Sequence, residues 1–341
     1  MQTQAFVSKT LKADQALNQK LEQFVERHQH GNFFQSPGFL HFINEVDGYK
    51  PVQLITTDEA GEIKGSLLGV YQSNGSNIKS WLSRRLIIWG GPLVTDEEDQ
   101  EVIKSLLEGL KKHGQGKAIY IEFRNFFDMS GMKGVFEQSG FQYRDHLNLL
   151  VKTDEETLVR KRIKKSRMQR IKTSLKKGAI IKEAETEAEV VEFYAILEEL
   201  YREKVKKPLP ALDLFLRFQQ NPDLCKFFVI VFDGEVIGGS VCPIFGGRTI
   251  YAWYVCGDDR KIKGMHPSAL ANWAAIEYGF QNDYNEFDFL GAGKPDEDYG
   301  VRTFKASFGA EEVCFGRFNL VLNKQLYKVG QLGLKVYQKI K

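Results

Sequence analysis

The 341-residue sequence has few cysteines, no long apolar run and no N-terminal export signal. Its four cysteines are scattered and show neither the spacing of a zinc site nor that of a disulfide framework: Cys225, Cys242, Cys256 and Cys314. No apolar run approaches the roughly 18 residues that span a bilayer. The first residues, MQTQAFVSKTLKAD, lack the charged-then-apolar profile of a secretory signal. These absences argue against a disulfide-stabilised secreted domain and predict a cytoplasmic protein.

Acidic residues are missing from a stretch of 26 residues, Thr157–Lys182, that is rich in lysine and arginine. Such a density of like charge is costly, which indicates an anionic ligand: nucleotide phosphate, lipid headgroup or RNA. Apolar residues in this stretch recur at spacings of three to five: Leu158, Ile163, Met168, Ile171 and Leu175. The pattern predicts one long helix over 157–177 with a core-facing stripe and a basic face. A solvated basic helix without a ligand is the alternative.

Charge is distributed unevenly between the two halves of the chain. Residues 1–150 carry a net charge of −2, whereas the remainder carries +5. An anionic ligand is therefore expected at the second half of the chain or at the junction between the halves.

The expected order of helices and strands occurs twice. In the first half, helices are expected at 14–27, 37–46, 97–113 and 129–139, and strands at 50–57, 62–71, 85–94, 117–124 and 141–151. In the second half, helices are expected at 187–204, 211–219, 267–281 and 300–306, and strands at 179–183, 227–232, 235–245, 248–256 and 287–290, with a final pair of strands to about 322. The order of helices, antiparallel meander, helix, strand, helix and strand resembles the GCN5-related N-acetyltransferase (GNAT) fold.

This repetition predicts an α/β (α+β) protein with two tandem GNAT-like domains, each a mixed, mostly antiparallel sheet flanked by helices. The expected domains are 1–153 and 154–323, the second including the basic helix 157–177. The tail from Phe315 contains no acid and alternates apolar residues with lysines. It predicts an amphipathic helix over 324–341 that packs on the first domain. The alternative is peripheral contact with anionic lipid at the inner face of a membrane.

Three segments carry a more specific resemblance. The run DFLGAGKPDEDYGVRTFKASFGAEEV at 288–313 contains an Asp-x-x-Gly strand end, a glycine turn and a Phe-Lys-x-x-Phe-Gly segment. The runs FFQSPGFLHF at 33–42 and RRLIIWGGPLV at 84–94 precede it. These segments, in this order, resemble the Fem family of aminoacyltransferases, which includes FemA, FemB and FemX.

The resemblance implies acyl transfer to an amine. Its best-known members move an amino acid from aminoacyl-tRNA onto an amine of a peptidoglycan precursor, whereas relatives include acyl-CoA-dependent N-acyltransferases, so the donor stays open. The sequence departs from the family where a phosphate-binding lysine follows the Gln-Ser entry. His41 is the only nearby candidate for that role here.

The resemblance assigns Lys305 to stabilisation of the tetrahedral oxyanion. Asp288 is expected at the C-terminal end of a strand, where it would orient Lys305 or accept the amine proton. The alternatives are a surface lysine between two core aromatics and an aspartate that caps a turn. Phe304 and Tyr299 are expected to contact substrate.

Basic residues supply the remaining binding candidates. Arg167 and Arg170 of the basic helix are expected to hold phosphates. Arg260 and Lys263 lie where GNAT enzymes bind the CoA pyrophosphate, but the glycine pattern is absent and Pro267 removes a backbone donor. We expect aminoacyl-tRNA or acyl-CoA as co-substrate, a cell-envelope precursor as acceptor, no bound cofactor and no metal. The alternatives are an acyl-CoA-dependent N-acyltransferase acting on an amino sugar or small amine, and a non-catalytic RNA- or membrane-binding module.

Overall fold

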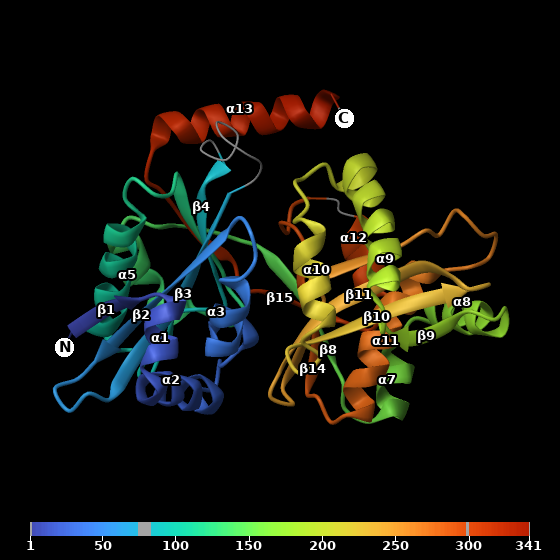
Figure 1. The fold of residues 1–341 in the computed structure, drawn as a ribbon, viewed down its shortest axis with the longest axis horizontal. Coiled ribbons are helices and arrows are strands. Elements are labelled where there is room, and N and C mark those ends of the chain that lie inside the picture. The colour runs from blue at the N-terminus through green and yellow to red at the C-terminus, as the bar shows by residue number, and fades with distance from the viewer. Residues whose placement is uncertain (1, 74–82, 298–299, 341) are drawn as a thin grey trace. The chain divides into compact units, whose positions relative to one another are not determined.

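The computed structural model describes residues 2–73, 83–297 and 300–340 and divides the chain into two compact units (Figure 1). Unit 1 comprises Met1–His146 and Cys314–Ile340, and unit 2 comprises Leu147–Val313. Each unit is built on an eight-stranded sheet with helices packed against it. The predicted class, two mixed and mostly antiparallel sheets flanked by helices, is confirmed.

The sheet of unit 1 has the strand order β1-β2-β3-β4-β6-β16-β7, with β5 paired to β3. Its strands are β1 (Gln2–Phe6), β2 (Tyr49–Thr57), β3 (Ile63–Gln72), β4 (Arg85–Trp89), β5 (Leu93–Val94), β6 (Tyr120–Arg124), β7 (Gln142–Arg144) and β16 (Arg317–Val321). Its helices are α1 (Ser8–Ala13), α2 (Gln15–Arg27), η1 (Phe33–Gln35), α3 (Pro37–Ile43), α5 (Gln100–Gly114), η2 (Ser130–Met132), α6 (Lys133–Gln138) and α13 (Lys324–Ile340). The pair β4/β6 is parallel, whereas its other pairs are antiparallel.

The Gln-Ser entry of the sequence has a structural role in unit 1. The fully buried Gln35 amide donates to the carbonyls of Leu68 and Trp89 at 3.1 and 2.8 Å, and its oxygen accepts from the Leu68 N–H at 2.8 Å. Ser36 caps α3 by accepting from the Phe39 N–H at 3.1 Å. This pair of residues therefore ties η1 and α3 to β3 and β4.

The sheet of unit 2 has the order β15-β8-β14-β12-β11-β10-β9, with β13 paired to β11. Its strands are β8 (Leu147–Lys152), β9 (Ile180–Glu183), β10 (Cys225–Phe232), β11 (Glu235–Phe245), β12 (Thr249–Tyr251), β13 (Tyr254–Gly257), β14 (Glu286–Gly291) and β15 (Glu311–Cys314). Its helices are α7 (Glu156–Arg162), α8 (Lys165–Lys176), α9 (Glu187–Leu200), the π-helical turn η3 (Tyr201–Val205), α10 (Leu212–Gln219), α11 (Pro267–Gln281) and α12 (Gly300–Ala306). The pair β12/β14 is parallel, as β4/β6 is in unit 1.

The two units do not end at the expected boundaries, 153 and 323. Two strands, β8 and β16, each pair in the other unit from the strand that precedes them in the chain. Strand β8 follows β7 of unit 1 in the chain but pairs with β14 in unit 2. Strand β16 follows β15 of unit 2 but lies between β6 and β7 in unit 1. The expected single strand over 141–151 is accordingly divided into β7 and β8.

The predicted basic helix over 157–177 is also corrected, because α7 and α8 are separated by an extended turn. Ile163 and Lys164 have ψ angles of 133° and 134°. The turn buries the Ile163 side chain and lets the Lys164 N–H donate to the Ser307 carbonyl at 3.0 Å. A continuous apolar stripe does not form, and Leu158 and Leu175 are exposed.

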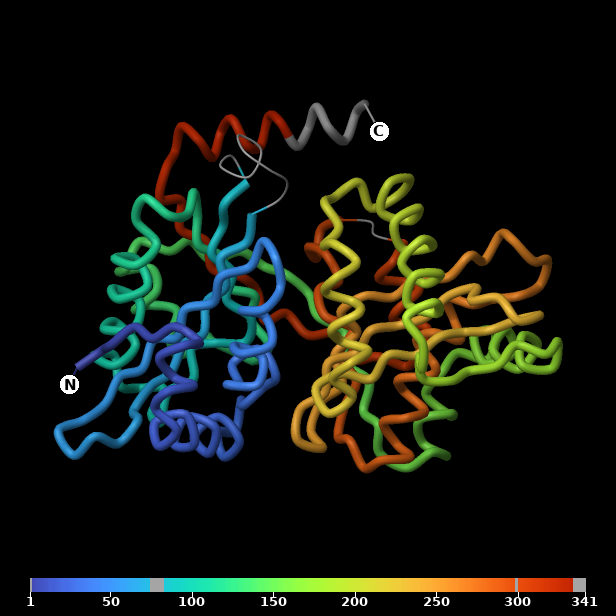
Figure 2. Tube along the Cα trace, viewed as in Figure 1, coloured from blue at the N-terminus to red at the C-terminus, as the bar shows by residue number. Residues whose placement is uncertain are grey.

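The C-terminal helix α13 follows β16 in the chain of unit 1 (Figure 2). At its start, the Tyr327 ring meets the Tyr120 ring edge-on at 5.4 Å. Farther along α13, Val329 and Leu332 are 51% and 64% exposed. The start of the helix is therefore anchored to β6, while large apolar side chains beyond Tyr327 face solvent.

Candidate active site

The candidate site in unit 2 begins where two parallel strands diverge. Strands β12 and β14 pair from Thr249 to Tyr251, the residue opposite Asp288. Beyond this point, the chain after β12 continues as β13, which pairs with β11. Strand β14 keeps its other neighbour, β8, as far as Gly291. Asp288 therefore lies at the end of the shared ladder, where its carbonyl still accepts from the Ala252 N–H at 2.9 Å.

Asp288 is a buried carboxyl group, with 2% of the residue exposed. One of its oxygens accepts from the Leu290 N–H at 2.6 Å, and Leu290 has a positive φ of 57°. The aspartate thus holds a strained turn, as one of the sequence-based alternatives predicted. Burial, together with the nearby Glu286, raises its pKa to about 7, although hydrogen bonds and Lys305 oppose the shift.

Lys305, near the end of α12, is held against this turn. Its ammonium donates to the carbonyls of Phe289 and Gly291 at 2.8 and 3.0 Å. Burial lowers its pKa to about 8, and the charge of Asp288 acts in the opposite direction. The alternative of a freely solvated surface lysine therefore does not fit its contacts.

The predicted residues Arg167, on α8, and Phe304, on α12, contact each other. The Arg167 guanidinium stacks on the Phe304 ring at 4.1 Å and donates to the Ser307 hydroxyl at 2.8 Å. Ser307 in turn donates to the Phe304 carbonyl. Arg167 is only 8% exposed, so it fixes α12 from α8 and offers little surface to a ligand.

Gly309 explains why the segment after Lys305 needs a glycine. Its φ is +81°, and a Cβ atom there would lie 2.6 to 2.8 Å from atoms of Arg162, including its backbone. The close approach joins the end of α12 to the turn between α7 and α8.

Arg302, one helical turn before Lys305, was not among the residues predicted from the sequence. Its guanidinium donates to the carbonyls of Ala292 and Pro295 at 3.1 and 3.2 Å and also to that of Lys294. It thereby organises the segment that follows β14. Residues three apart on a helix are neighbours, so the spacing of Arg302 and Lys305 in the sequence could have indicated that both lie near the site.

At the N-terminus of α11, where the GNAT resemblance would place a pyrophosphate, three backbone donors already have acceptors. The His266 N–H donates to the Ser174 hydroxyl at 3.0 Å, and the Ser268 N–H donates to an Asp259 carboxylate oxygen at 3.0 Å. Pro267 has no N–H. The Ala269 N–H bonds the His266 carbonyl. A phosphate at this helix end would have to displace these contacts.

The predicted residues Arg170, Arg260 and Lys263 are exposed in the same region. Arg170 and Lys177 lower the pKa of His266, after the larger effect of burial. Lys177 donates to the Lys263 carbonyl at 2.6 Å. These contacts bring the end of α8 and the β13–α11 loop together as one basic surface, whereas Arg260 pairs instead with Glu203 at 3.1 Å.

Two other predicted residues do not join this group. His41 lies in unit 1, where its ring nitrogens bond the Ser8 hydroxyl and the Asn18 side-chain oxygen at 2.9 Å each. Burial lowers its pKa, which favours the neutral ring and a structural role. Tyr299 lies outside the described residues.

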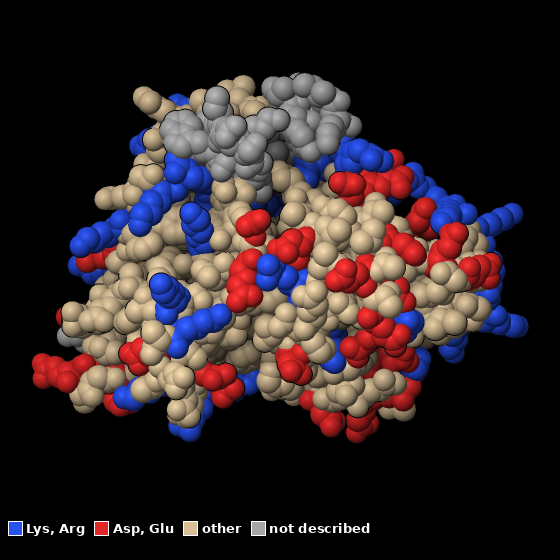
Figure 3. Space-filling model, viewed as in Figure 1, with Lys and Arg blue, Asp and Glu red and all other residues tan. Residues whose placement is uncertain are grey.

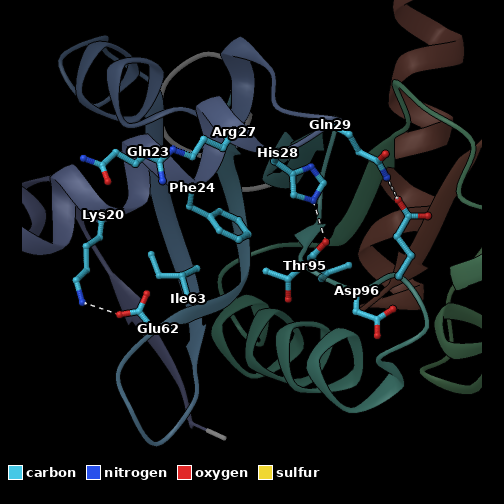
Figure 4. Close-up of a pocket in the computed structure, with 12 residues that line it drawn as sticks. Lys20, Gln23, Phe24, Arg27, His28, Gln29, Glu62, Ile63, Thr95 and Asp96 are labelled. Carbon is cyan, nitrogen blue, oxygen red and sulfur yellow. Dashed lines mark hydrogen bonds and ion pairs between the residues drawn. The ribbon is translucent and has the colours of Figure 1, made fainter.

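A separate pocket of about 620 Å³ opens in unit 1 between α2 and the segments 62–63 and 94–97 (Figure 4). Phe24, Ile63 and Val94 supply its apolar lining, whereas Lys20 pairs with Glu62 at 3.3 Å across its rim. It contains none of the predicted site residues. Glu97, at the same rim, accepts from Gln29 at 3.1 Å. The polar groups of the pocket thus pair along its rim and do not converge on one point, as they would in a catalytic site.

Several other features of the described residues bear on function. Cys225, Cys242 and Cys256 are buried free thiols, and burial raises the pKa of each. In the part of the chain that the structure describes, no cluster of metal-ligating side chains is formed. Among the described helices, none has both the length and the apolar character needed to cross a membrane.

These features define a tandem GNAT-like fold with an ammonium group and a carboxyl group at the end of one sheet. Residues 159–300 match the Acetyltransferase (GNAT) domain family. The sequence-based prediction of an acyltransferase is supported by this match and by the fold.

Solved structures of the same architecture cover nearly the whole chain. FemX aligns with a TM-score of 0.70 at 13% identity over 96% of this chain and 99% of its own. A tandem GNAT protein from the clavulanic acid biosynthesis pathway aligns at 0.59 and 10% identity, over 94% and 98%. L-PGS from Bacillus licheniformis aligns at 0.56 and 13% identity, over 94% and 96%. The comparison with curated proteins finds no match. The Fem-like tandem fold predicted from the sequence is thus confirmed.

Proposed function

We propose that this chain transfers an aminoacyl group from aminoacyl-tRNA to an amine of a peptidoglycan or other cell-envelope precursor. The acceptor amine attacks the ester carbonyl, a tetrahedral oxyanion forms, and the ester oxygen of the tRNA leaves. The attacking amine loses one proton in these steps, and the leaving oxygen of the tRNA takes one up to become a hydroxyl group. Because aminoacyl-tRNA is a cytoplasmic molecule, this proposal places the reaction in the cytoplasm.

The observation that carries the proposal is the pairing of Lys305 with Asp288. The Lys305 ammonium is partly dehydrated and fixed by two carbonyls, so its charge acts on a nearby oxyanion with little reorganisation. Asp288, with a pKa of about 7, is suited to accept a proton at neutral pH. We assign Lys305 to oxyanion stabilisation and Asp288 to proton acceptance.

The donor assignment rests on the end of α11. Three N–H groups at the start of this helix, those of His266, Ser268 and Ala269, are engaged by Ser174, Asp259 and the His266 carbonyl, so they are not open to a CoA pyrophosphate. Basic residues of α8 remain exposed nearby, and Figure 3 shows lysine and arginine side chains at the edge of unit 2 where α8 lies in Figure 1. An exposed basic surface without a phosphate cradle favours an RNA backbone over CoA.

Charged tRNA provides the direct test. We expect the full chain to retain labelled aminoacyl-tRNA on a filter, to lose it steeply as salt rises, and to bind the charged form in preference to the uncharged form. Lys172→Gln combined with Lys176→Gln on α8 should weaken retention, whereas the matched pair Lys9→Gln and Lys20→Gln on unit 1 should not. Competition by acetyl-CoA but not by tRNA would overturn the proposal.

That outcome would favour an acyl-CoA-dependent N-acyltransferase, the reaction class suggested by the domain match at residues 159–300. Retention of tRNA without any transfer to an amine acceptor would instead indicate a binding module. The two outcomes are distinguishable because the first requires acetyl-CoA binding and the second requires its absence.

We further propose that α13 brings the enzyme to anionic membrane, where a lipid-linked acceptor would lie. The helix carries exposed Val329 and Leu332 and lysines but no acid. Co-sedimentation with phosphatidylglycerol vesicles tests this: the full chain should bind and a chain ending at residue 323 should not. Equal binding of both chains would exclude α13 as the anchor.

A further inference from the structure

One face of the unit 1 sheet carries a row of arginines on three neighbouring strands. In the register of β6, β16 and β7, Arg317 lies opposite Arg124 on one side and opposite Arg144 on the other. Directly opposed residues point to the same face of a sheet. The other face is covered by α6, whose Phe136 packs against Phe318 and Phe123. The three guanidinium groups, the arginine row, therefore gather on the face away from α6.

Positive charge exceeds negative charge on this face. Glu122 accepts from Arg124 at 2.7 Å and from Arg317 at 3.4 Å, so it serves two members of the row. A fourth guanidinium, that of Arg85 on β4, bonds the Gln72 side chain at 2.9 Å. Among the described residues of β4, β6, β16 and β7 on this face, the Glu122 carboxylate is thus outnumbered by four guanidinium groups. Like charges directly opposite on paired strands destabilise a sheet.

These charges are also partly removed from water. The side chains of Arg124 and Arg317 are 32% and 28% exposed, and that of Glu122 is 17% exposed. Burial alone would raise the pKa of Glu122, but the two arginines hold it at about 2. Burial and the charge of Arg124 together lower the pKa of Arg317 to about 10. Repulsion between dehydrated cations is a cost that a bound anion would remove.

We infer that the arginine row is a binding site for the phosphate or diphosphate group of a small ligand. Guanidinium forks bind phosphate oxygens in a bidentate manner, and neighbouring strands place them about 4.8 Å apart. Such spacing suits two linked anionic groups better than one. Tyr49 and Tyr120 adjoin the row, and burial raises the pKa of both, so they remain neutral hydroxyl groups that can also donate. The site belongs to unit 1 and does not depend on the proposed reaction.

A small ligand is favoured over RNA because two members of the row are largely buried in the sheet. RNA backbones are typically held by exposed cations on a broad surface, as on α8. On this face, the cations converge around one carboxylate instead. The register therefore concentrates positive charge on a small area of the sheet, which suits a diphosphate.

Calorimetric titration of the full chain with inorganic pyrophosphate, and separately with inorganic phosphate, tests the site. We expect pyrophosphate to bind more tightly than phosphate. Arg144→Gln, an exposed position, and Arg317→Gln should each weaken pyrophosphate binding about tenfold or more. Glu122→Gln should tighten it, because the competing carboxylate is lost. Arg27→Gln, an exposed arginine on α2, is the matched control and should leave binding unchanged.

The outcomes separate a ligand site from a purely structural ion network. If pyrophosphate does not bind at millimolar concentration, or binds equally well to Arg144→Gln, the inference is overturned. Weaker binding to Glu122→Gln, together with reduced stability, would also refute it and indicate a structural role. If Arg317→Gln fails to fold, Arg144→Gln still decides the question. Loss of tRNA retention in Arg144→Gln without loss of pyrophosphate binding would assign the row to RNA and refute the small-ligand inference.

Discussion

Replacing Lys305 by methionine removes one ammonium group and leaves most of the side chain's volume in place. In the native chain, this ammonium donates to the carbonyls of Phe289 and Gly291. Methionine keeps an unbranched apolar side chain of similar length but cannot donate a hydrogen bond. The substitution therefore separates the electrostatic role of Lys305 from its role in packing.

Stability should change little, because two effects oppose each other. A shift of the Lys305 pKa from 10.5 to about 8 corresponds to about 3 kcal/mol of penalty for burying the charged form. Methionine removes that penalty but leaves two carbonyls without a charged donor, at about 1 to 3 kcal/mol each. We expect the free energy of unfolding at pH 7 to change by less than about 2 kcal/mol.

The penalty also has a definite pH dependence. Because the folded-state pKa of Lys305 is below the unfolded value, the native state binds fewer protons between about pH 8 and 10.5. The stability of the native chain should therefore rise through this window relative to that of Lys305→Met. Urea titrations at pH 7 and pH 10 measure the difference.

Activity should change much more than stability. Loss of one preorganised oxyanion donor typically costs about 10²- to 10³-fold in kcat. In the native enzyme, the rate that depends on the ammonium should fall as pH rises through about 8, the pKa of Lys305. An ordinary lysine would keep its charge to about pH 10. The limb near pH 8 should therefore disappear in Lys305→Met.

The assay follows transfer of a radiolabelled amino acid from charged tRNA to a precursor peptide that bears a free amine. Lys294→Met is the matched control, because that lysine is 59% exposed and pairs with Glu297 on the surface. The control should retain full activity and the full pH profile. If Lys305→Met keeps its kcat within about threefold of the native value while remaining folded, the assignment of Lys305 to the oxyanion is wrong.

Three other substitutions test separate parts of the structure. Asp288→Asn should raise the free energy of unfolding at pH 8 by up to about 4 kcal/mol. Because the Asp288 pKa is raised to about 7, the native chain loses stability as pH rises from 4 to 7. Urea titrations of the variant should not show this fall in the free energy of unfolding with pH. A variant with the same fall as the native chain would contradict the raised pKa. Gly309→Ala should lower the melting temperature through about 2 kcal/mol or more of strain against Arg162, and a silent substitution would contradict the close approach. Ser174→Ala should cost about 1 kcal/mol by removing the acceptor of the His266 N–H, as chemical denaturation can measure, whereas a stabilised variant would show that this contact is unimportant.

Local patterns predicted most elements because the periodicity of each segment is visible within that segment. The helix expected at 97–113 and the strand expected at 235–245 match α5 and β11 closely. The break between α7 and α8 could not be predicted in this way. It depends on the Ser307 carbonyl, 143 residues after Lys164, and on burial of Ile163 in a core that only the folded chain creates. The exchange of β8 and β16 likewise depends on pairing with strands that are distant in the sequence.

The candidate site shows the same division between local and distant information. Lys305 and Asp288 could be predicted because the resemblance lies in one continuous segment. The arginine row could not, since Arg124, Arg144 and Arg317 come from separate strands and become neighbours only through their register. The alternation of polar and apolar residues in YIEFR at 120–124 and RFNLV at 317–321 indicates one polar face on each strand. It does not indicate which strands are adjacent.

The pKa values of Asp288 and Lys305 connect the local structure to the proposed reaction. An acceptor amine arrives mainly as an ammonium ion, with an ordinary pKa of about 10.4, and must lose a proton before or during attack. A carboxylate with an ordinary pKa near 4 is a weak base for that task, whereas burial gives Asp288 a pKa of about 7. The same dehydration lowers the pKa of Lys305, but the charge of Asp288 opposes this effect. The pKa is about 8, so Lys305 remains largely charged at neutral pH. Near pH 7.5, the site can therefore hold a base and a cation together, and the divergence of β12/β13 from β14 places both at the end of one strand.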